Sequence, residues 1–141
     1  MTPAGERPLV SQVVLDTTDA RGLAEFYRQL LGLSYRDGDE PPPVGEADVA
    51  GHDWLVLRNP GGVQLAFQQV DDLTPASWPD AAVPQQLHLD MTVRTREALE
   101  AERERATALG ATVLLDRTDD PDEPLYVLAD PAGHPFCVFV G

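Results

Sequence analysis

The sequence lacks the features that mark exported, membrane-spanning and disulfide-bonded proteins. Among its 141 residues there is a single cysteine, Cys137, which cannot form a disulfide within the chain and fits a reducing compartment. No apolar run approaches the roughly 20 residues that a membrane-spanning helix needs. Residues 1–8 contain neither the basic nor the apolar segment of a signal peptide. We therefore expect a cytoplasmic protein with no membrane partner.

Positive charge is also scarce. Lysine and arginine number 10 against 24 aspartate and glutamate residues, and the formal net charge is -14. A chain of this charge repels the phosphates of nucleic acids, so nucleic-acid binding is disfavoured. The acidic balance is compatible with a cationic ligand, although a well-solvated surface accounts for it as well. Glycine-rich phosphate-binding loops, serine nucleophile motifs and zinc-finger spacings are absent.

What is present is one pattern that occurs twice. In the first copy a helix begins after Asp19, and the turn at residues 59–62 precedes an apolar strand. In the second copy a helix begins after Thr95, and the turn at residues 130–133 precedes another apolar strand. Each predicted helix ends at a glycine, which is typical of helix C-termini. The duplication predicts two similar halves that build one compact unit.

Hydrophobic periodicity gives each copy the order strand, helix and three strands. The predicted elements are strands at 9–17, 33–37, 54–58 and 63–70 with a helix from 19 to 32, then strands at 86–93, 112–115, 125–129 and 136–140 with a helix at 95–109. The two copies form modules at residues 9–70 and 85–141, and a proline-containing linker at 71–84 joins them. We expect residues 1–141 to form a single α+β domain.

A long polar segment interrupts the first module. Residues 37–53 contain three consecutive prolines and six acidic residues, too polar and too broken for regular structure. A loop of this length is either a lid over a site or a disordered excursion.

Strand parity places polar side chains on one face of the first strand of each module. His88, Asp90 and Thr92 share a face in the second module, as Gln12 and Asp16 do in the first. A histidine on such a face can anchor a ligand, act as a general base that Asp90 orients, or simply be bonded to its neighbours. The predicted cavity-lining residues are Gln12, Asp16, Gln64, Gln68, His88, Thr92, Cys137 and Phe139, with Trp54 beside them.

Other side chains have more ordinary interpretations. Trp54, Trp78 and Tyr126 are candidates for stacking on a planar ligand, but aromatic rings more often pack in cores or interfaces. Cys137 is expected to be a small buried hydrophobic residue and not a nucleophile, because no basic residue adjoins it. His134 follows a glycine and precedes a proline, which predicts a structural contact in a turn.

Several segments together resemble the vicinal oxygen chelate superfamily. They are Gln12 to Asp19, Phe26-Tyr27, Leu31-Gly32-Leu33, and Asp130 to His134 before the last strand. That superfamily includes glyoxalase I, bleomycin-resistance proteins, fosfomycin-resistance proteins and extradiol dioxygenases. The resemblance runs from Leu9 to Gly141 and is greatest to metal-poor, glyoxalase-like members. It implies two tandem βαβββ modules whose mixed sheets curl around a central cavity, often completed in a homodimer.

The resemblance also implies where a metal would bind. In metal-dependent members the ligands come from the first and last strands of each module, which correspond to Gln12, Ala66, His88 and Cys137 here. Ala66 cannot ligate a metal and glutamine is a weak ligand, so His88 and Cys137 are the two good donors. Asp90 is expected to lie about 7 Å from His88 along the strand, awkward for one ion. We therefore expect a cavity without a metal cofactor, and any divalent metal would use His88, Cys137 and Gln12.

Three functions remain open. The first is a dimeric small-molecule-binding protein that sequesters a drug or metabolite of cationic or planar character. The second is an enzyme, a lyase, isomerase or dioxygenase, in which His88 is a metal ligand or a base oriented by Asp90. The third is a dimeric interaction domain with a vestigial cavity. One scaffold hosts all of these activities, so the resemblance does not choose between them.

Overall fold

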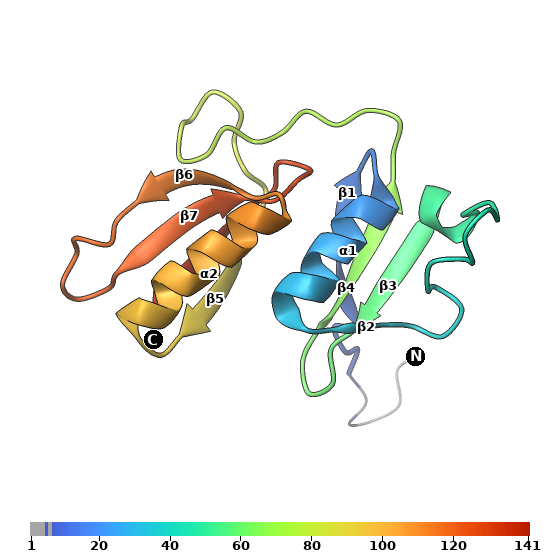
Figure 1. The fold of residues 1–141 in the computed structure, drawn as a ribbon, viewed down its shortest axis with the longest axis horizontal. Coiled ribbons are helices and arrows are strands. Elements are labelled where there is room, and N and C mark those ends of the chain that lie inside the picture. Colours follow the sequence, from blue (N-terminus) through green and yellow to red (C-terminus); the bar gives the residue numbers. More distant parts are fainter. Residues whose placement is uncertain (1–4, 6) are drawn as a thin grey trace.

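The computed structural model describes Gly5 and residues 7–141, and it contains two similar modules. The first consists of β1 (Gln12–Thr17), α1 (Ala20–Leu31), β2 (Ser34–Tyr35), the 3-10 turn η1 (Ala50–His52), β3 (Trp54–Arg58) and β4 (Gln64–Gln69). The second consists of β5 (Leu89–Val93), α2 (Arg96–Leu109), β6 (Thr112–Asp116), β7 (Leu125–Ala129) and β8 (Pro135–Val140). The sheets lie side by side, and the segment between β4 and β5 arches from one to the other (Figure 1).

Both sheets have the same topology. The strand orders are β1-β4-β3-β2 and β5-β8-β7-β6, with the first pair parallel and the others antiparallel. The prediction of an α+β fold with two tandem βαβββ modules and mixed sheets is confirmed. None of the described helices is long and apolar enough to cross a membrane.

The first strands of the two modules are shorter than predicted. β1 begins at Gln12, which pairs with Gln64, the first residue of β4, so residues 9 and 10 lie beyond the end of that strand. β5 begins at Leu89 because the preceding residues bend, and His88 Nδ1 contacts Gln85 Oε1 at 3.0 Å. The predicted strand at 33–37 is reduced to Ser34–Tyr35.

The helix ends follow from local chemistry as predicted. Asp19 Oδ1 accepts the Gly22 amide at 3.0 Å, and Thr95 Oγ1 accepts the Ala98 amide at 3.0 Å. Gly32 ends α1 with a φ of 67°, the left-handed conformation that glycine adopts without a steric penalty.

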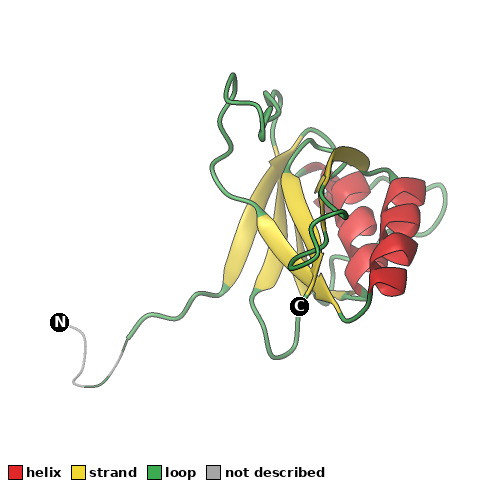
Figure 2. Cartoon of the chain, turned by 90° about the vertical axis from the view of Figure 1, so that its left-hand side faces the viewer, coloured by secondary structure: helices red, strands yellow, loops and turns green. Residues whose placement is uncertain are grey.

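The core runs through both modules. The helices lie on the same side of the two sheets (Figure 2), so each sheet has a covered face and an open face. At the centre, Phe26 and Tyr27 of α1 meet Phe136 of β8, with a distance of 6.0 Å between the Phe26 and Phe136 ring centroids. Arg105 of α2 also donates to the last carbonyls of α1, at Gln29 and Leu30. The modules therefore share buried contacts and pack as one unit.

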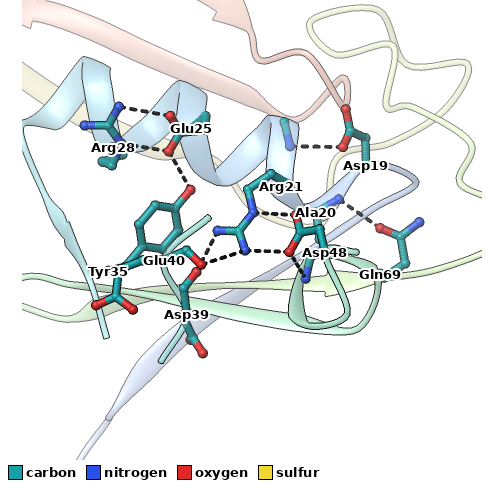
Figure 3. A network of polar contacts seen from close by, with 12 residues as sticks. Asp19, Ala20, Arg21, Glu25, Arg28, Tyr35, Asp39, Glu40, Asp48 and Gln69 are labelled. Carbon is teal, nitrogen blue, oxygen red and sulfur yellow. Dashed lines mark hydrogen bonds and ion pairs between the residues drawn. The ribbon is translucent and has the colours of Figure 1, made fainter. Parts of the chain in front are cut away.

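The long loop of the first module is fastened to α1 by an arginine (Figure 3). Arg21 binds both carboxylate oxygens of Asp48 at 2.8 Å and donates to the Asp39 carbonyl at 2.6 Å. Asp39 in turn accepts the amide of Val56 in β3 at 2.9 Å. The hydrogen bonds of Arg21 and Asp39 secure this loop to the first module, which argues against a disordered excursion.

This contact predicts a pH-dependent contribution to stability. The Arg21 guanidinium lowers the pKa of Asp48 from 3.8 to about 2. Because the folded-state pKa is depressed, the stabilisation is present above pH 3.8 and is lost as pH falls through about 2. We expect Asp48→Asn to lower the free energy of unfolding by about 1 kcal/mol at neutral pH.

The measurement is denaturant unfolding of both proteins across this acid range. The difference in the free energy of unfolding between the native protein and Asp48→Asn should shrink as Asp48 becomes protonated. Asp37→Asn, in the exposed start of the same loop, makes the same change in charge and should have little effect at any pH. A constant difference down to the lowest pH would show that the ion pair does not carry the effect.

Candidate functional site

A pocket of about 360 Å³ lies on the open face of the second sheet, and we call it the His88 pocket. Tyr126 and Leu128 of β7 and their β8 neighbours point to α2, so alternate residues face outward. The floor of the pocket is therefore formed by Leu125, Val127, Cys137 and Phe139. His88, Asp90, Arg117 and Glu123 supply its polar groups.

Three potential metal-ligating side chains meet in this pocket. One ligand atom each from His88, Asp90 and Cys137 lies within 4.8 Å of the others, and His88 Nε2 is 3.1 Å from Asp90 Oδ1. The expectation that Asp90 lies too far from His88 to share an ion is wrong. His88 stands just before β5, where the regular spacing of a strand does not yet apply.

The imidazole of His88 is fixed on three sides. Its Nδ1 lies 3.0 Å from Gln85 Oε1, and its Nε2 lies 3.1 Å from Asp90 Oδ1. The indole of Trp78 stacks on the ring with a centroid distance of 4.9 Å and an interplanar angle of 12°. His88 is thus bonded to its neighbours, which was one of the three roles that the sequence suggested for it, and it also lines the pocket. The same contacts would orient a ligand or a base.

Trp78 comes from a structured part of the segment between the modules. The Ser77 amide donates to the Val83 carbonyl at 2.8 Å, and the Val83 amide donates to Ser77 Oγ at 2.7 Å. These bonds close a small loop that carries the indole over Cys137 and its apolar neighbours. Trp78, one of three aromatic side chains that the sequence offered for stacking, thus lines the pocket. Tyr126, another of the three, points away from the pocket, and its hydroxyl donates to Glu100.

The environment of the Cys137 thiol disfavours a nucleophilic role. The side chain is buried, and burial together with the nearby Asp90 carboxylate raises the pKa of the thiol to about 11. The thiol is therefore protonated at neutral pH, which agrees with the expectation of a small apolar residue.

The donors in the pocket nevertheless fit a divalent metal. A nitrogen, an oxygen and a sulfur ligand are the types that zinc accepts, and catalytic zinc commonly has three protein ligands. His88, Asp90 and Cys137 would hold the ion, with Gln85 bonded to the free nitrogen of the imidazole. A bound divalent cation would act as a Lewis acid there. Its binding would displace the proton of the Cys137 thiol.

The first module carries no equivalent set of donors. Strand register places Val14, Ala66 and Val56 in one row across its open face, where the second module has Asp90, Cys137 and Val127. Ala66 and Cys137 thus occupy matching positions, as the family resemblance implies. Because all three side chains of this row are hydrocarbon, the first module has no metal-ligating group at the positions where the second module has Asp90 and Cys137.

The other predicted lining residues lie elsewhere. Asp16 and Gln68 line a pocket of about 370 Å³ between the two modules, which we call the seam pocket. Gln12, Gln64 and Trp54 lie on strands of the first sheet outside both pockets, and Thr92 pairs with Phe139 near the C-terminus. Within one chain these residues do not line a single cavity, because the modules stand side by side with both helices on one side (Figure 2).

Some site residues gave little signal in the sequence. Gln85, Arg117 and Glu123 lie in irregular segments, where no periodicity indicates which way a side chain points. His134 makes the expected structural contact, since its Nε2 lies 2.6 Å from the Asp16 carbonyl across the seam.

Comparisons with known proteins agree with this architecture. A family model described as a glyoxalase-like domain matches residues 12–139. A glyoxalase/bleomycin resistance protein/dioxygenase family enzyme from Burkholderia phytofirmans is 19% identical, with a TM-score of 0.66 over 93% of this chain and 97% of its own. A glyoxalase/dioxygenase from Nostoc punctiforme is 19% identical, with a TM-score of 0.64 over 99% of this chain and 94% of its own.

A lactoylglutathione lyase from Agrobacterium tumefaciens has the same fold. It is 20% identical, with a TM-score of 0.58 over 99% of this chain and 96% of its own. No curated protein matches the sequence significantly. The likeness to these structures establishes the fold, and the chemistry has to be argued from the pocket.

Proposed function

Because this chain belongs to the glyoxalase-like domain family, we propose that it is a small-molecule-binding protein that holds a planar ligand in the His88 pocket. The observation that carries the proposal is the Trp78 indole, which stacks on His88 at 4.9 Å above an apolar floor. An indole that is stacked on an imidazole through one face can stack on a planar molecule through its other face. The volume of about 360 Å³ falls in the range of small-molecule sites, which begins at about 300 Å³.

Charge around the pocket indicates the polar character of the ligand. The carboxylates of Asp90 and Glu123 and one guanidinium, that of Arg117, line the pocket, and Arg117 pairs with Asp120 at 3.4 Å. Asp90 is 58% exposed and is therefore accessible to a ligand. A planar molecule with a cationic or hydrogen-bond-donating edge fits these groups, and sequestration of such a drug or metabolite is the function we propose.

A homodimer belongs to the same proposal. Leu9 and Val10, just before the edge strand β1, are 90% and 75% exposed. Apolar side chains gathered at a sheet edge favour contact with a second copy. Such a contact would cover the edge while leaving the His88 pocket to the ligand.

The test is isothermal titration calorimetry with two probes, proflavine as a planar cation and bleomycin. We expect binding of at least one probe, and we expect Trp78→Ala to weaken it about tenfold, the equivalent of about 1.4 kcal/mol. Trp54→Ala is the matched control, because Trp54 is also half-buried but lies outside the pocket. Equal losses in the two variants, or no binding of either probe, would contradict the proposal.

A metal arm of the same experiment separates binding from metal-dependent catalysis. The titration is repeated with EDTA and with added zinc. Binding that persists in EDTA supports sequestration without a metal. Binding that requires zinc and is abolished in Cys137→Ser would instead favour a metal-dependent enzyme that uses His88, Asp90 and Cys137.

A further inference from the structure

We propose that the seam pocket is a second small-molecule site, which takes a ligand with an amidine, guanidine or ammonium head and an apolar body. It is separate from the His88 pocket and does not depend on the function proposed for it. The pocket has a volume of about 370 Å³ and lies where β1, the segment between the modules and the start of the second module meet.

The polar end of the seam pocket is formed by Asp16 and Gln68. The two residues are register partners on the parallel strands β1 and β4, so their side chains stand side by side on the open face. Both are exposed, and within Gly5 and residues 7–141 neither side chain has a hydrogen bond or ion pair. A carboxylate and an amide oxygen next to each other match the paired donors of an amidinium or guanidinium group.

The walls of the seam pocket are mainly apolar. Val14 and Leu87 line it from the two modules and are 40% and 51% exposed. Leu73 and Pro84 line it from the segment between the modules. A ligand with an apolar body would remove these side chains from water, which contributes favourable binding energy at about 25 cal/mol per Å² of buried area.

Several contacts hold the seam pocket open in one shape. His134 Nε2 lies 2.6 Å from the Asp16 carbonyl and so fixes the second module against β1. Gly133 lies against Pro75, so closely that a Cβ atom at Gly133 would fall 2.5 Å from the Pro75 Cβ. A pocket fixed in this way loses little conformational freedom when a ligand binds.

Gln85 touches both pockets. It lines the seam pocket, and its Oε1 lies 3.0 Å from His88 Nδ1. A substitution at Gln85 would therefore disturb both sites, so the experiment changes Asp16 and leaves Gln85 intact.

The experiment follows the amide resonances of the 15N-labelled protein during titration with benzamidine. We expect shifts at residues 14–16, 68 and 85–87, with the indole resonance of Trp78 unchanged. Asp16→Asn should weaken benzamidine binding at least about tenfold, and benzamide, the neutral analogue, should bind the native protein about as weakly. Asp119→Asn, an exposed change of the same charge in the second module, should leave the affinity within about twofold.

Three results would overturn the seam site. The first is shifts confined to residues of the His88 pocket, and the second is no shift at the solubility limit of benzamidine. The third is an equal loss of affinity in the Asp16 and Asp119 variants, which would indicate attraction by net charge alone. None of these results bears on proflavine or bleomycin binding at Trp78, so the two proposals fail independently.

Discussion

Removing the Tyr27 hydroxyl is expected to lower the free energy of unfolding by about 2–3 kcal/mol, because it leaves one oxygen of a buried carboxylate without a donor. Tyr27 Oη donates to Asp130 Oδ2 at 2.6 Å, and the two residues are 0% and 4% exposed. The other oxygen of Asp130 accepts the amides of Ala132 and His134. The Tyr27 to Asp130 bond joins α1 of the first module to the β7–β8 turn of the second.

The pH dependence of the Tyr27→Phe variant tests the same contact. Burial raises the pKa of Asp130 above its ordinary value, and the Tyr27 hydrogen bond opposes this rise. A raised folded-state pKa means that stability is highest below the unfolded-state pKa and falls as pH rises through the folded-state value. Without the hydroxyl, the pKa of Asp130 rises further. The difference between the two proteins should therefore be small in acid and largest at neutral pH.

The measurement is denaturant unfolding at several pH values, with Tyr126→Phe as the matched control. The Tyr126 hydroxyl bonds to Glu100, whose carboxylate also pairs with Arg103 and reaches solvent, so its loss should cost under about 1 kcal/mol. Equal effects of the two substitutions would show that the burial of Asp130 is not the cause. A Tyr27→Phe effect that is independent of pH would exclude the carboxylate.

Gly133→Ala is expected to have an effect of similar size, about 2–3 kcal/mol, for a steric reason. Gly133 has a φ of 94°, a conformation unfavourable for alanine, and its added methyl group would lie 2.5 Å from the Pro75 Cβ. The segment between the modules would have to move away from the β7–β8 turn. Because the same segment carries Trp78, its displacement should also change the fluorescence of that residue in a Trp54→Phe background.

Gly61→Ala supplies the control for Gly133→Ala. Gly61 lies in the corresponding turn of the first module with a φ of 81°, but no atom lies within 4 Å of its added methyl group. It should cost only the conformational term, about 1 kcal/mol, and leave Trp78 fluorescence unchanged. If both glycine variants lose the same stability, the contact with Pro75 is not what holds the segment in place.

The elements of the fold were predictable because their signals are local. The Asp19 and Thr95 caps bond to amides three residues away, and Gly32 adopts the conformation that a helix end requires. The alternation that put Asp90 and Thr92 on one face needs only the geometry of an extended chain. The loop at 37–53 was predicted as irregular for the same reason, although nothing local indicated that Arg21 fastens it.

The pockets were less predictable than the strands around them. The sequence placed Asp16, Gln68, His88 and Cys137 around one cavity, whereas the structure divides them between the seam pocket and the His88 pocket. The division follows from how the modules lie beside each other, a matter of packing that strand parity does not address. Gln85 contacts His88 because the chain bends before β5, and the sequence has no periodic pattern there that would predict the direction of the bend.

The sequence by itself determined two copies of one βαβββ unit, the ends of their helices and the faces of their strands, because neighbouring residues decide each of these through hydrogen bonding and periodicity. Only the tertiary structure decided that Trp78 covers His88 and that Tyr27 meets Asp130, 103 residues away in the sequence. Such contacts depend on the path of an aperiodic segment and on the packing of two modules. Burial of the residues in these contacts then shifts pKa values and forms the site.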